Sequence, residues 1–303
     1  MSKFKRAVII DLSECDQVRA GMSGDRAPRA VFPSIVGEAP AIRRGDAFEW
    51  KPLATALHGV YKAMDLHVGA DPVLLALPTG VDMAQRGHLA RVAFADLKVP
   101  ALLMVDAAVA VLRASRRSSG VVALFGDEDT RVTAVRDDEV IASRRLDLGG
   151  RRLSGDGGDA SLDYDEELQT APTLRHPIVA AAILDHLPDA YFKPNLLGLE
   201  QDGIHTQVLA VIAGAPATIG HELAANVLLA GSAAGFPGID VRLARELRAL
   251  APEGLPVKVD ASPEHAVHLG GASLASLSTF EEMWITAPDF ERVGPRILET
   301  RRR

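Results

Sequence analysis

Histidines and the single cysteine are the residue types best suited to bind a transition metal, but their spacing argues against such a site. His265 and His268 form an H-x-x-H pair, and His221 precedes Glu222. Neither pair has a further ligand nearby in the sequence, no H-E-x-x-H occurs, and Cys15 stands alone. Because protein zinc sites use three or four side-chain ligands, these residues predict no zinc site.

Motifs for nucleophilic catalysis and phosphate binding are also missing from the sequence. Neither G-x-S-x-G nor a P-loop occurs. Ser232 follows an apolar run but lacks the flanking glycines of a nucleophile elbow, which favours a small residue in a tight turn. The acidic run Asp163–Glu167 lacks the glycine and ligand alternation of a calcium loop, so we interpret it as a solvated segment.

Charge and composition exclude several classes of protein. The 303 residues carry a net charge of −7, which argues against a nucleic-acid surface. No apolar run approaches the ~18–20 residues of a membrane span, and the apolar run after the basic N-terminus stops at Asp11, too early for a signal peptide. With one cysteine, the chain is expected to be cytoplasmic. The excess of arginine over lysine predicts a bacterial source.

Apolar strand-like runs alternate with amphipathic stretches, which predicts an α/β fold of two similar halves with a cleft between them. In the first half we expect strands at Ala7–Asp11, Val73–Leu77 and Ala101–Val105, and helices at Asp82–Leu97 and Ala107–Ser115. In the second half we expect strands at Gly120–Gly126, Arg131–Arg136, Glu139–Leu148, Val227–Ala230 and Pro256–Asp260, and helices at Ile239–Leu250, Gly271–Leu277 and Phe280–Ile285.

Each half opens with a strand that ends in an acidic turn, at Ser13–Asp16 and at Gly126–Asp129. In the middle of the chain, Arg151–Thr173 is rich in glycine and acid and has little periodicity, which indicates an exposed loop. One helix is expected after it, over Pro177–Leu187.

Several long stretches resemble actin. Gly24–Gly37 reads GDRAPRAVFPSIVG and departs from the actin signature GDDAPRAVFPSIVG only at Arg26. Gly270-Gly271, Leu274–Phe280 and Met283–Ile285 resemble the actin C-terminal region, and Phe236–Ile239 with Leu247–Pro252 is similar to its "FPGI…LTALAP". The matches follow the family order over most of the chain.

The resemblance implies an α/β, actin-like two-lobed fold of the actin/Hsp70/sugar-kinase type, with duplicated α/β inner subdomains and truncated outer ones. The first lobe would comprise 1–115 and 270–303, its outer subdomain nearly absent around 38–48. The second lobe would comprise 116–269, with the inner subdomain at 116–150 and 192–269 and a reduced outer subdomain at 151–191. The implied ligand is Mg-ATP, held in the cleft by two glycine-containing turns.

The first phosphate turn departs from the family pattern D-N-G-S-G. This chain reads Asp11-Leu-Ser-Glu-Cys15, so Asp11 is retained as a cation-side acid while both glycines are replaced. Glu14 stands where a phosphate-binding serine belongs, and its charge would repel a triphosphate. Arg19 takes the place of a lysine, with the same charge and a different shape.

The second turn departs from D-S-G-D-G-V-T in a similar way. Gly126, Asp127 and Thr130 match, but the leading acid is Leu124 and a glycine is Glu128. The family's catalytic glutamine position falls on Ala107, which cannot orient a water molecule. The resemblance therefore implies no catalytic residue in this chain.

These comparisons leave a set of site residues carried over from the family. The cofactor-binding candidates are Asp11, Ser13, Arg19, Gly126, Asp127, Thr130, Gly150, Gly231 and Ser232, and the magnesium candidates are Asp11 and Asp127. For Asp11 and Asp127 the alternative is a structural carboxylate that caps backbone N–H groups. We expect Mg-ATP binding to be weak or absent.

A groove between the inner subdomains is the partner site that the resemblance implies. Its candidates are Ala114, Ser115, Leu274, Leu277 and Thr279, and core packing of the two leucines is the alternative. Arg113 and Arg116 would make one wall basic, which suits an acidic amphipathic segment such as Leu162–Leu168.

Three functions remain open from the sequence. The first is an actin-like cytoskeletal or scaffold protein with a degraded cleft, which associates with itself or with protein partners. The second is an ATP-binding filament former whose assembly the nucleotide controls. The third is a divergent kinase or ATPase, which intact phosphate turns would favour.

Overall fold

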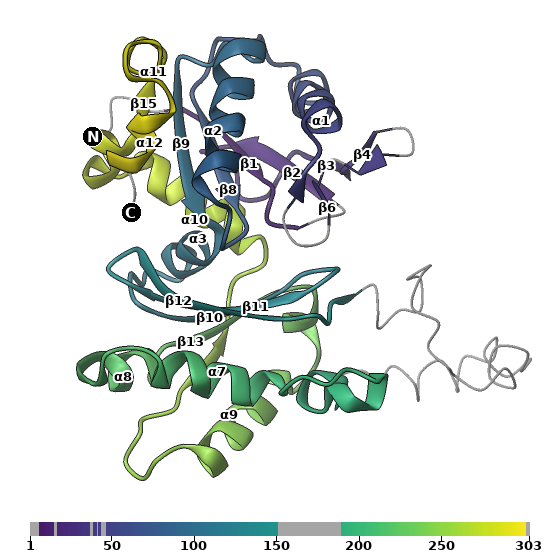
Figure 1. Ribbon diagram of the computed structural model, residues 1–303, viewed down its shortest axis with the longest axis vertical. Coiled ribbons are helices and arrows are strands. Elements are labelled where there is room, and N and C mark those ends of the chain that lie inside the picture. The colour runs from purple at the N-terminus through teal and green to yellow at the C-terminus, as the bar shows by residue number, and fades with distance from the viewer. Residues whose placement is uncertain are drawn as a thin grey trace, which may run out of the picture.

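Two β-sheets of the same layout form the centre of the molecule (Figure 1). The computed structural model describes residues 6–14, 17–36, 39–40, 42–43, 47–150 and 189–300. The first sheet has the strand order β15-β9-β8-β1-β2-β3, with the bounds Ile285–Thr286, Ala101–Asp106, Val73–Leu77, Val8–Asp11, Gln17–Met22 and Ala30–Pro33. Strands β1, β8 and β9 are parallel, and β2 and β3 extend the sheet as an antiparallel meander.

The second sheet repeats this pattern. Its order is β12-β11-β10-β13-β14, with the bounds Glu139–Leu146, Thr130–Arg136, Gly120–Phe125, Val227–Gly231 and Val259–Ala261. Strand β10 pairs with β13 in parallel, as β1 does with β8, and β10-β11-β12 is antiparallel like β1-β2-β3. The duplicated α/β arrangement that the sequence predicted is therefore present.

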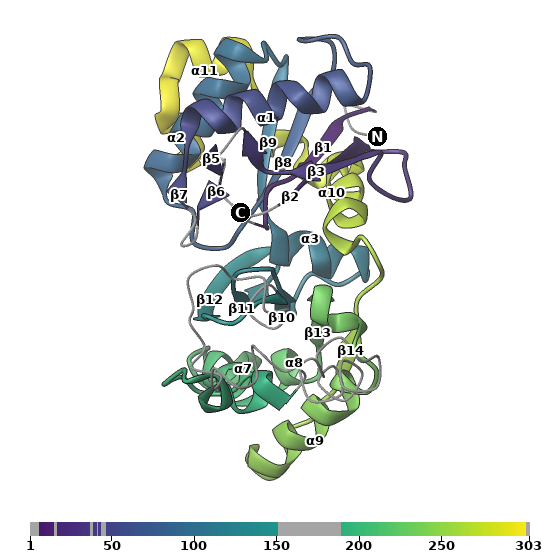
Figure 2. The same cartoon turned by 90° about the vertical axis from the view of Figure 1, so that its right-hand side faces the viewer.

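Helices cover both sheets (Figures 1 and 2). The α-helices are α1 (Trp50–Ala63), α2 (Met83–Arg91), α3 (Ala107–Ala114), α7 (Ile204–Ala213), α8 (Ala217–Ala224), α9 (Ile239–Leu250), α10 (Ala266–Ser276), α11 (Ala287–Val293) and α12 (Ile297–Thr300). A π-helical turn η1 (Val92–Asp96) extends α2, and 3-10 turns lie at η3 (Pro194–Leu197), η4 (Ser232–Gly235), η5 (Ser278–Met283) and η6 (Gly294–Arg296). Two short hairpins precede α1: β4 (Ile35–Val36) with β5 (Ala39–Pro40), and β6 (Ile42–Arg43) with β7 (Ala47–Phe48).

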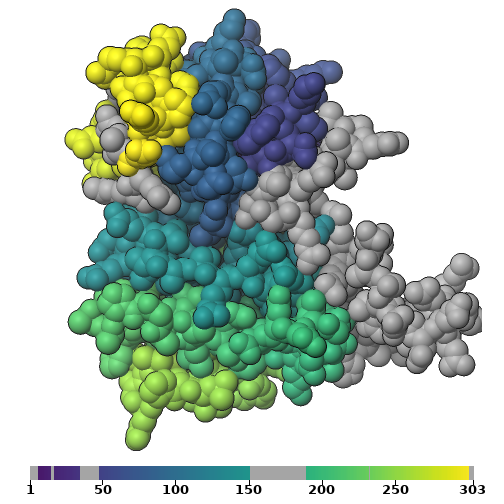
Figure 3. Space-filling view, viewed as in Figure 1, coloured from purple at the N-terminus to yellow at the C-terminus, as the bar shows by residue number. Residues whose placement is uncertain are grey.

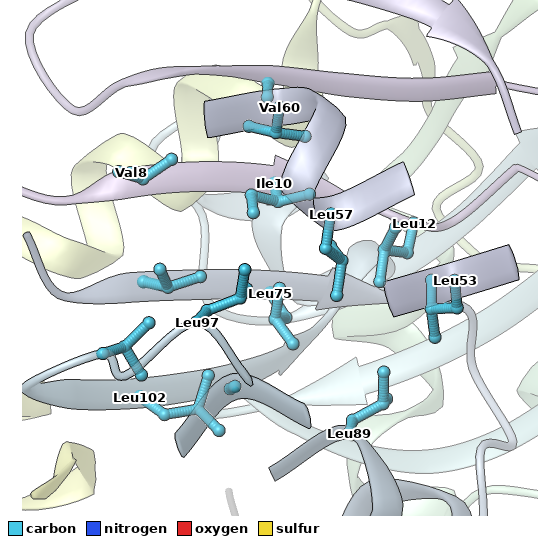
Figure 4. Packing of buried hydrophobic residues seen from close by; sticks show 14 of the residues in the cluster. Val8, Ile10, Leu12, Leu53, Leu57, Val60, Leu75, Leu89, Leu97 and Leu102 are labelled. Carbon is cyan, nitrogen blue, oxygen red and sulfur yellow. The ribbon is translucent and has the colours of Figure 1, made fainter. Parts of the chain in front are cut away.

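Alternation along the strands divides the apolar residues among three core layers. Val8 and Ile10 of β1 pack against α1 and α2, as Figure 4 shows for this layer, whereas Ile9 faces α3 and α10. In β10, Val122 faces the same middle layer, and Val121 faces the layer under α7, α8 and α9. Helices α3 and α10 therefore lie between the two sheets (Figure 2).

Local sequence accounts for the best-predicted elements. Strand β8 and helix α9 have the bounds that the sequence predicted. Strand β8 is apolar at every position because it is buried on both faces, as central parallel strands are. Helix α2 begins at Asp82, whose carboxylate accepts a hydrogen bond from the Gln85 backbone N–H at 2.8 Å in a capping box.

The predictions near the C-terminus need correction. A helix over Phe280–Ile285 is wrong: η5 ends at Met283, and Ile285 pairs with Leu102 of β9 as part of β15. Helix α10 begins at Ala266, five residues earlier than predicted, and β14 is displaced toward Ala261. The predicted loop at Arg151–Thr173 and the predicted helix at Pro177–Leu187 lie outside the described residues.

In a space-filling view, the two sheets with their helices form two stacked masses, one purple to blue with the yellow C-terminal helices and one teal to green (Figure 3). The chain passes between them through α3 and again between β14 and α10 (Figure 2). The residue limits of the two lobes stay a prediction. Within the described residues, no helix combines the length and the apolar character that a membrane crossing requires.

Candidate functional site

A cleft of about 630 Å³ lies between the two lobes, where β1 and β13 end and α10 begins. The carboxyl ends of parallel strands are where α/β proteins place ligands. The first lobe contributes Asp11, Glu14 and Arg19, and Leu124 and Gly231 come from the second. The remaining wall consists of Pro28, Ala230, Ala234, Gly235 and residues 261–268.

Asp11 lies at the bottom of this cleft and is almost fully buried. Its Oδ1 accepts hydrogen bonds from the backbone N–H of Ser13 at 2.9 Å and from the Ser13 hydroxyl at 2.6 Å. Burial and the nearby negative charge of Glu14 raise the pKa of Asp11 to about 6, against the lowering effect of the Ser13 hydrogen bonds. Ser13 therefore holds the carboxylate of Asp11.

The raised pKa of Asp11 predicts an unusual pH dependence of stability. Between about pH 4 and 6, the folded protein holds a proton on Asp11 that the unfolded chain releases, so stability falls as the pH rises through this window. Asp11→Asn removes the charge and keeps an oxygen for Ser13. We expect this variant to be more stable than wild type at pH 8, by roughly 3 kcal/mol.

The measurement is urea unfolding of Asp11→Asn and wild type at pH 8 and near pH 4. The advantage of the variant should disappear at the lower pH, where the folded wild type is also neutral at this position. An equal difference at both pH values would contradict the burial of an ionised Asp11.

Glu14 and Arg19 form an ion pair inside the cleft, with Arg19 Nη2 2.7 Å from Glu14 Oε2. Glu14 is only 7% exposed, and the same nitrogen of Arg19 donates to Gln17 Oε1 at 3.1 Å. Burial opposes the charge of Arg19, but the hydrogen bond and charge of Glu14 raise its pKa above the ordinary value. The arginine and the glutamate of the first turn are therefore paired with each other.

Three residues of the second turn and the glycine after β12 use polar groups for contacts within their own lobe. The backbone N–H of Gly126 donates to the carbonyl of Asp129 at 2.9 Å, and that of Gly150 donates to the carbonyl of Gly126 at 3.0 Å. Thr130 is fully buried, and its hydroxyl donates to the carbonyl of Leu148 at 2.7 Å. Asp127 is half-buried, and neither it nor these three residues line the cleft.

Gly231 lines the cleft, and the reason for this glycine is close packing. Its φ is +86°, and a Cβ there would lie 2.1 Å from the carbonyl oxygen of Phe125 in the neighbouring strand. The glycine lets β13 end tightly against β10. The side chain of Ser232 lies outside the described residues.

The wall formed by residues 261–268 was not assigned to the site from the sequence. His265 and His268 both line the cleft, so the H-x-x-H motif marked the segment of the sequence that forms this wall. His268 is 2% exposed, burial lowers its pKa, and its Nε2 has no hydrogen-bond partner among the described residues. Nowhere in the described chain do three or more histidine, cysteine or acidic residues gather as metal ligands would.

Ala107, at the position of the family glutamine, is buried as the first residue of α3. The preceding residue, Asp106, accepts a hydrogen bond from Arg86 Nη2 at 3.2 Å, and both side chains are buried. The start of α3 therefore carries an internal ion pair beside an alanine.

A buried polar bridge joins the lobes. Arg131 of β11 donates through Nη1 to the carbonyl of Thr79, which follows β8, and through Nη2 to Asp129 Oδ2 at 2.9 Å. The Thr133 hydroxyl lies 3.4 Å from the Thr79 hydroxyl. Arg131, Asp129 and Thr79 are each 8% exposed, so solvent screens this contact little.

The predicted partner groove needs two corrections. Leu274 is fully buried in the middle core layer, so it cannot contact a partner. Arg113 binds Asp138 through two hydrogen bonds, so one of the two arginines expected to make the wall basic is neutralised.

The other groove candidates remain accessible to different degrees. Ala114, Ser115 and Leu277 are half-buried, and Thr279 and Arg116 are exposed. The predicted acidic occupant Leu162–Leu168 lies outside the described residues.

Comparison with protein families gives a match that extends over most of the chain. The family model described as Actin matches residues 41–173 and 180–303. The matched ranges include the second sheet, α3, and the α10 wall of the cleft.

Proposed function

Because the chain belongs to the actin family, we propose that it is an actin-like scaffold or cytoskeletal protein that associates with itself or with protein partners and hydrolyses little or no ATP. The observation that carries this proposal is the Glu14–Arg19 ion pair inside the interlobe cleft. The family resemblance implies Mg-ATP as the ligand, so the proposal depends on whether the residues present fit that group.

The residues of the cleft do not fit a magnesium triphosphate. Glu14 is a buried carboxylate beside Asp11, and a triphosphate would add further negative charge next to both. Arg19, the basic residue of the first turn, is already paired. Leu124 lines the opposite wall and offers no oxygen to a magnesium ion, which prefers oxygen ligands.

Loss of hydrolysis follows from the same set of positions. Catalysis would need a group that orients an attacking water, and Ala107 has none. The Arg131 bridge also supports a scaffold, because the Arg131 side chain joins the lobes directly through the Thr79 backbone carbonyl. For association, the accessible positions of the predicted groove are Ala114, Ser115, Leu277 and Thr279.

A second candidate is an ATP-binding filament former whose assembly is controlled by the nucleotide. It is favoured by the size of the cleft, since about 630 Å³ lies within the 300–1,000 Å³ typical of ligand sites.

Calorimetric titration with Mg-ATP, combined with sedimentation velocity, separates the two candidates. For wild type we expect no saturable heat and the same sedimentation profile with and without Mg-ATP. Glu14→Ser should bind Mg-ATP at least about tenfold more tightly than wild type, because it removes a repelling charge and frees Arg19.

Glu264→Gln is the matched control, because Glu264 is an exposed carboxylate at the rim of the same cleft. It should change nucleotide binding far less than Glu14→Ser does. Tight, stoichiometric binding of Mg-ATP by wild type would reject the degraded cleft and favour the nucleotide-controlled filament.

A further inference from the structure

The interlobe cleft keeps a ligand-sized volume although its charges oppose phosphate. On the second-lobe side its wall is made of small residues with little polar surface: Ala230, Gly231, Ala234, Gly235 and Ala261. Such a wall can accept a compact apolar body. A cleft that had merely collapsed would have no such space.

The formal charges at this cleft have one predominant sign. The lining residues include three carboxylates, Asp11, Glu14 and Glu264, and one guanidinium, that of Arg19. Arg19 pairs with Glu14 and also attracts Asp11, whose hydrogen bonds come from the neutral Ser13. Two carboxylates therefore share one guanidinium. Walls of low dielectric strengthen the field of such uncompensated charge.

An unsatisfied hydrogen-bonding group lies on the same wall. His268 is almost fully buried, and its Nε2 lacks a hydrogen-bond partner among the described residues. Buried polar atoms are normally paired, and the edge of the ring that carries this nitrogen lies beside Gly21 of β2. Because burial lowers the pKa of His268, it adds no positive charge at neutral pH, and the facing groups Asp25 and His265 do not reverse that direction.

We propose that the cleft binds a small organic cation, an amidinium, guanidinium or ammonium group on a compact apolar body, with the positive group against Asp11 and Glu14. This inference rests on the proposed function, in which the same cleft no longer holds Mg-ATP. The cation supplies the charge that Asp11 lacks, and its apolar body covers the small-residue wall.

Three probes of nearly equal shape test the charge requirement: benzamidine, benzamide and benzoate, which are positive, neutral and negative at pH 8. Ligand-observed saturation-transfer NMR should show benzamidine binding at least about tenfold more tightly than benzamide, as expected when a charged hydrogen bond is gained. Benzoate should not bind. Equal binding of benzamidine and benzamide, or no binding of benzamidine, would overturn the proposal.

Two variants that change the charge in opposite directions guard against effects of misfolding. Glu14→Gln should weaken benzamidine binding, and Arg19→Gln should strengthen it by releasing Glu14. A loss of structure would weaken binding in both variants. Glu253→Gln, an exposed carboxylate that is not among the cleft residues, should leave it unchanged.

The outcomes also separate this inference from the proposed function. Tight Mg-ATP binding by wild type would defeat the proposed function. If neither Mg-ATP nor benzamidine bound, the proposed function would stand and the cation site alone would be rejected.

Discussion

Replacing Arg131 by methionine is expected to lower the free energy of unfolding by about 3 kcal/mol, as breaking a buried ion pair does. Methionine keeps most of the length of the side chain but removes the bonds to the Thr79 carbonyl and to Asp129. Asp129 would then be a buried carboxylate that keeps a longer ion pair with Arg145, at 3.7 Å. The variant should also loosen the contact between the lobes, because the lost hydrogen bond to Thr79 joins β11 of the second sheet to the chain that follows β8 of the first.

Denaturant unfolding and small-angle X-ray scattering measure the two effects of Arg131→Met. Arg145→Met is the matched control: it removes the same charge from the neighbouring strand, where Arg145 contacts Asp129 and Asp147 without reaching the first lobe. We expect this control to lose less than about 1 kcal/mol, as exposed ion pairs do, and to keep the wild-type radius of gyration. If both variants behaved alike, the bridge would have no role between the lobes.

The Arg131 bridge is a contact that could not be predicted from the sequence. The alternation of Arg131-Val-Thr-Ala-Val-Arg136 correctly predicted a hairpin strand, and β11 pairs with β10 along its length. Alternation alone would place a charged residue on a solvated face, yet Arg131 is buried. Its partner Thr79 lies 52 positions away in the sequence, so no local pattern of residues predicts that contact.

Local apolar patterns predicted two elements at their full length. Strand β8 is a short run that is apolar and buried at every position, and the buried residues of helix α9 recur with helical spacing. Strand β15 has only two residues and forms because Ile285 reaches Leu102, so it has no period of its own. The extended pattern around it was consequently mistaken for a helix.

The sequence predicted where the candidate site lies, but it did not predict the contacts among its side chains. Family resemblance led to Asp11, Arg19 and Gly231, which do line the cleft. The sequence predicted a separate effect of Glu14 and of Arg19 on a phosphate. In the structure, the turn between β1 and β2 brings the two side chains within 2.7 Å of each other. The roles of these residues in binding stay a prediction.

Replacing Gly270 by alanine is expected to destabilise the protein by about 3 kcal/mol or more, at the upper end for overpacked cores. Helix α10 crosses α3 at this glycine, and a Cβ would lie 1.7 Å from the carbonyl oxygen of Ala110 and 2.9 Å from its Cα. These are backbone atoms, so the clash cannot be relieved by a rotamer change. The two helices would have to move apart within the middle core layer.

Thermal and urea unfolding should be measured for Gly270→Ala and for Gly220→Ala. The second variant is the control, because a Cβ at Gly220 has room. Gly220 is also helical, in α8, but the nearest atom to its Cβ would be Ile212 Cγ2 at 3.9 Å. There alanine should stabilise by up to about 1 kcal/mol through its helix propensity. Equal effects at both sites would mean that α3 and α10 tolerate separation. The chain passes between the lobes at these two helices. If the helices tolerated separation, their close packing would not be what fixes the arrangement of the lobes.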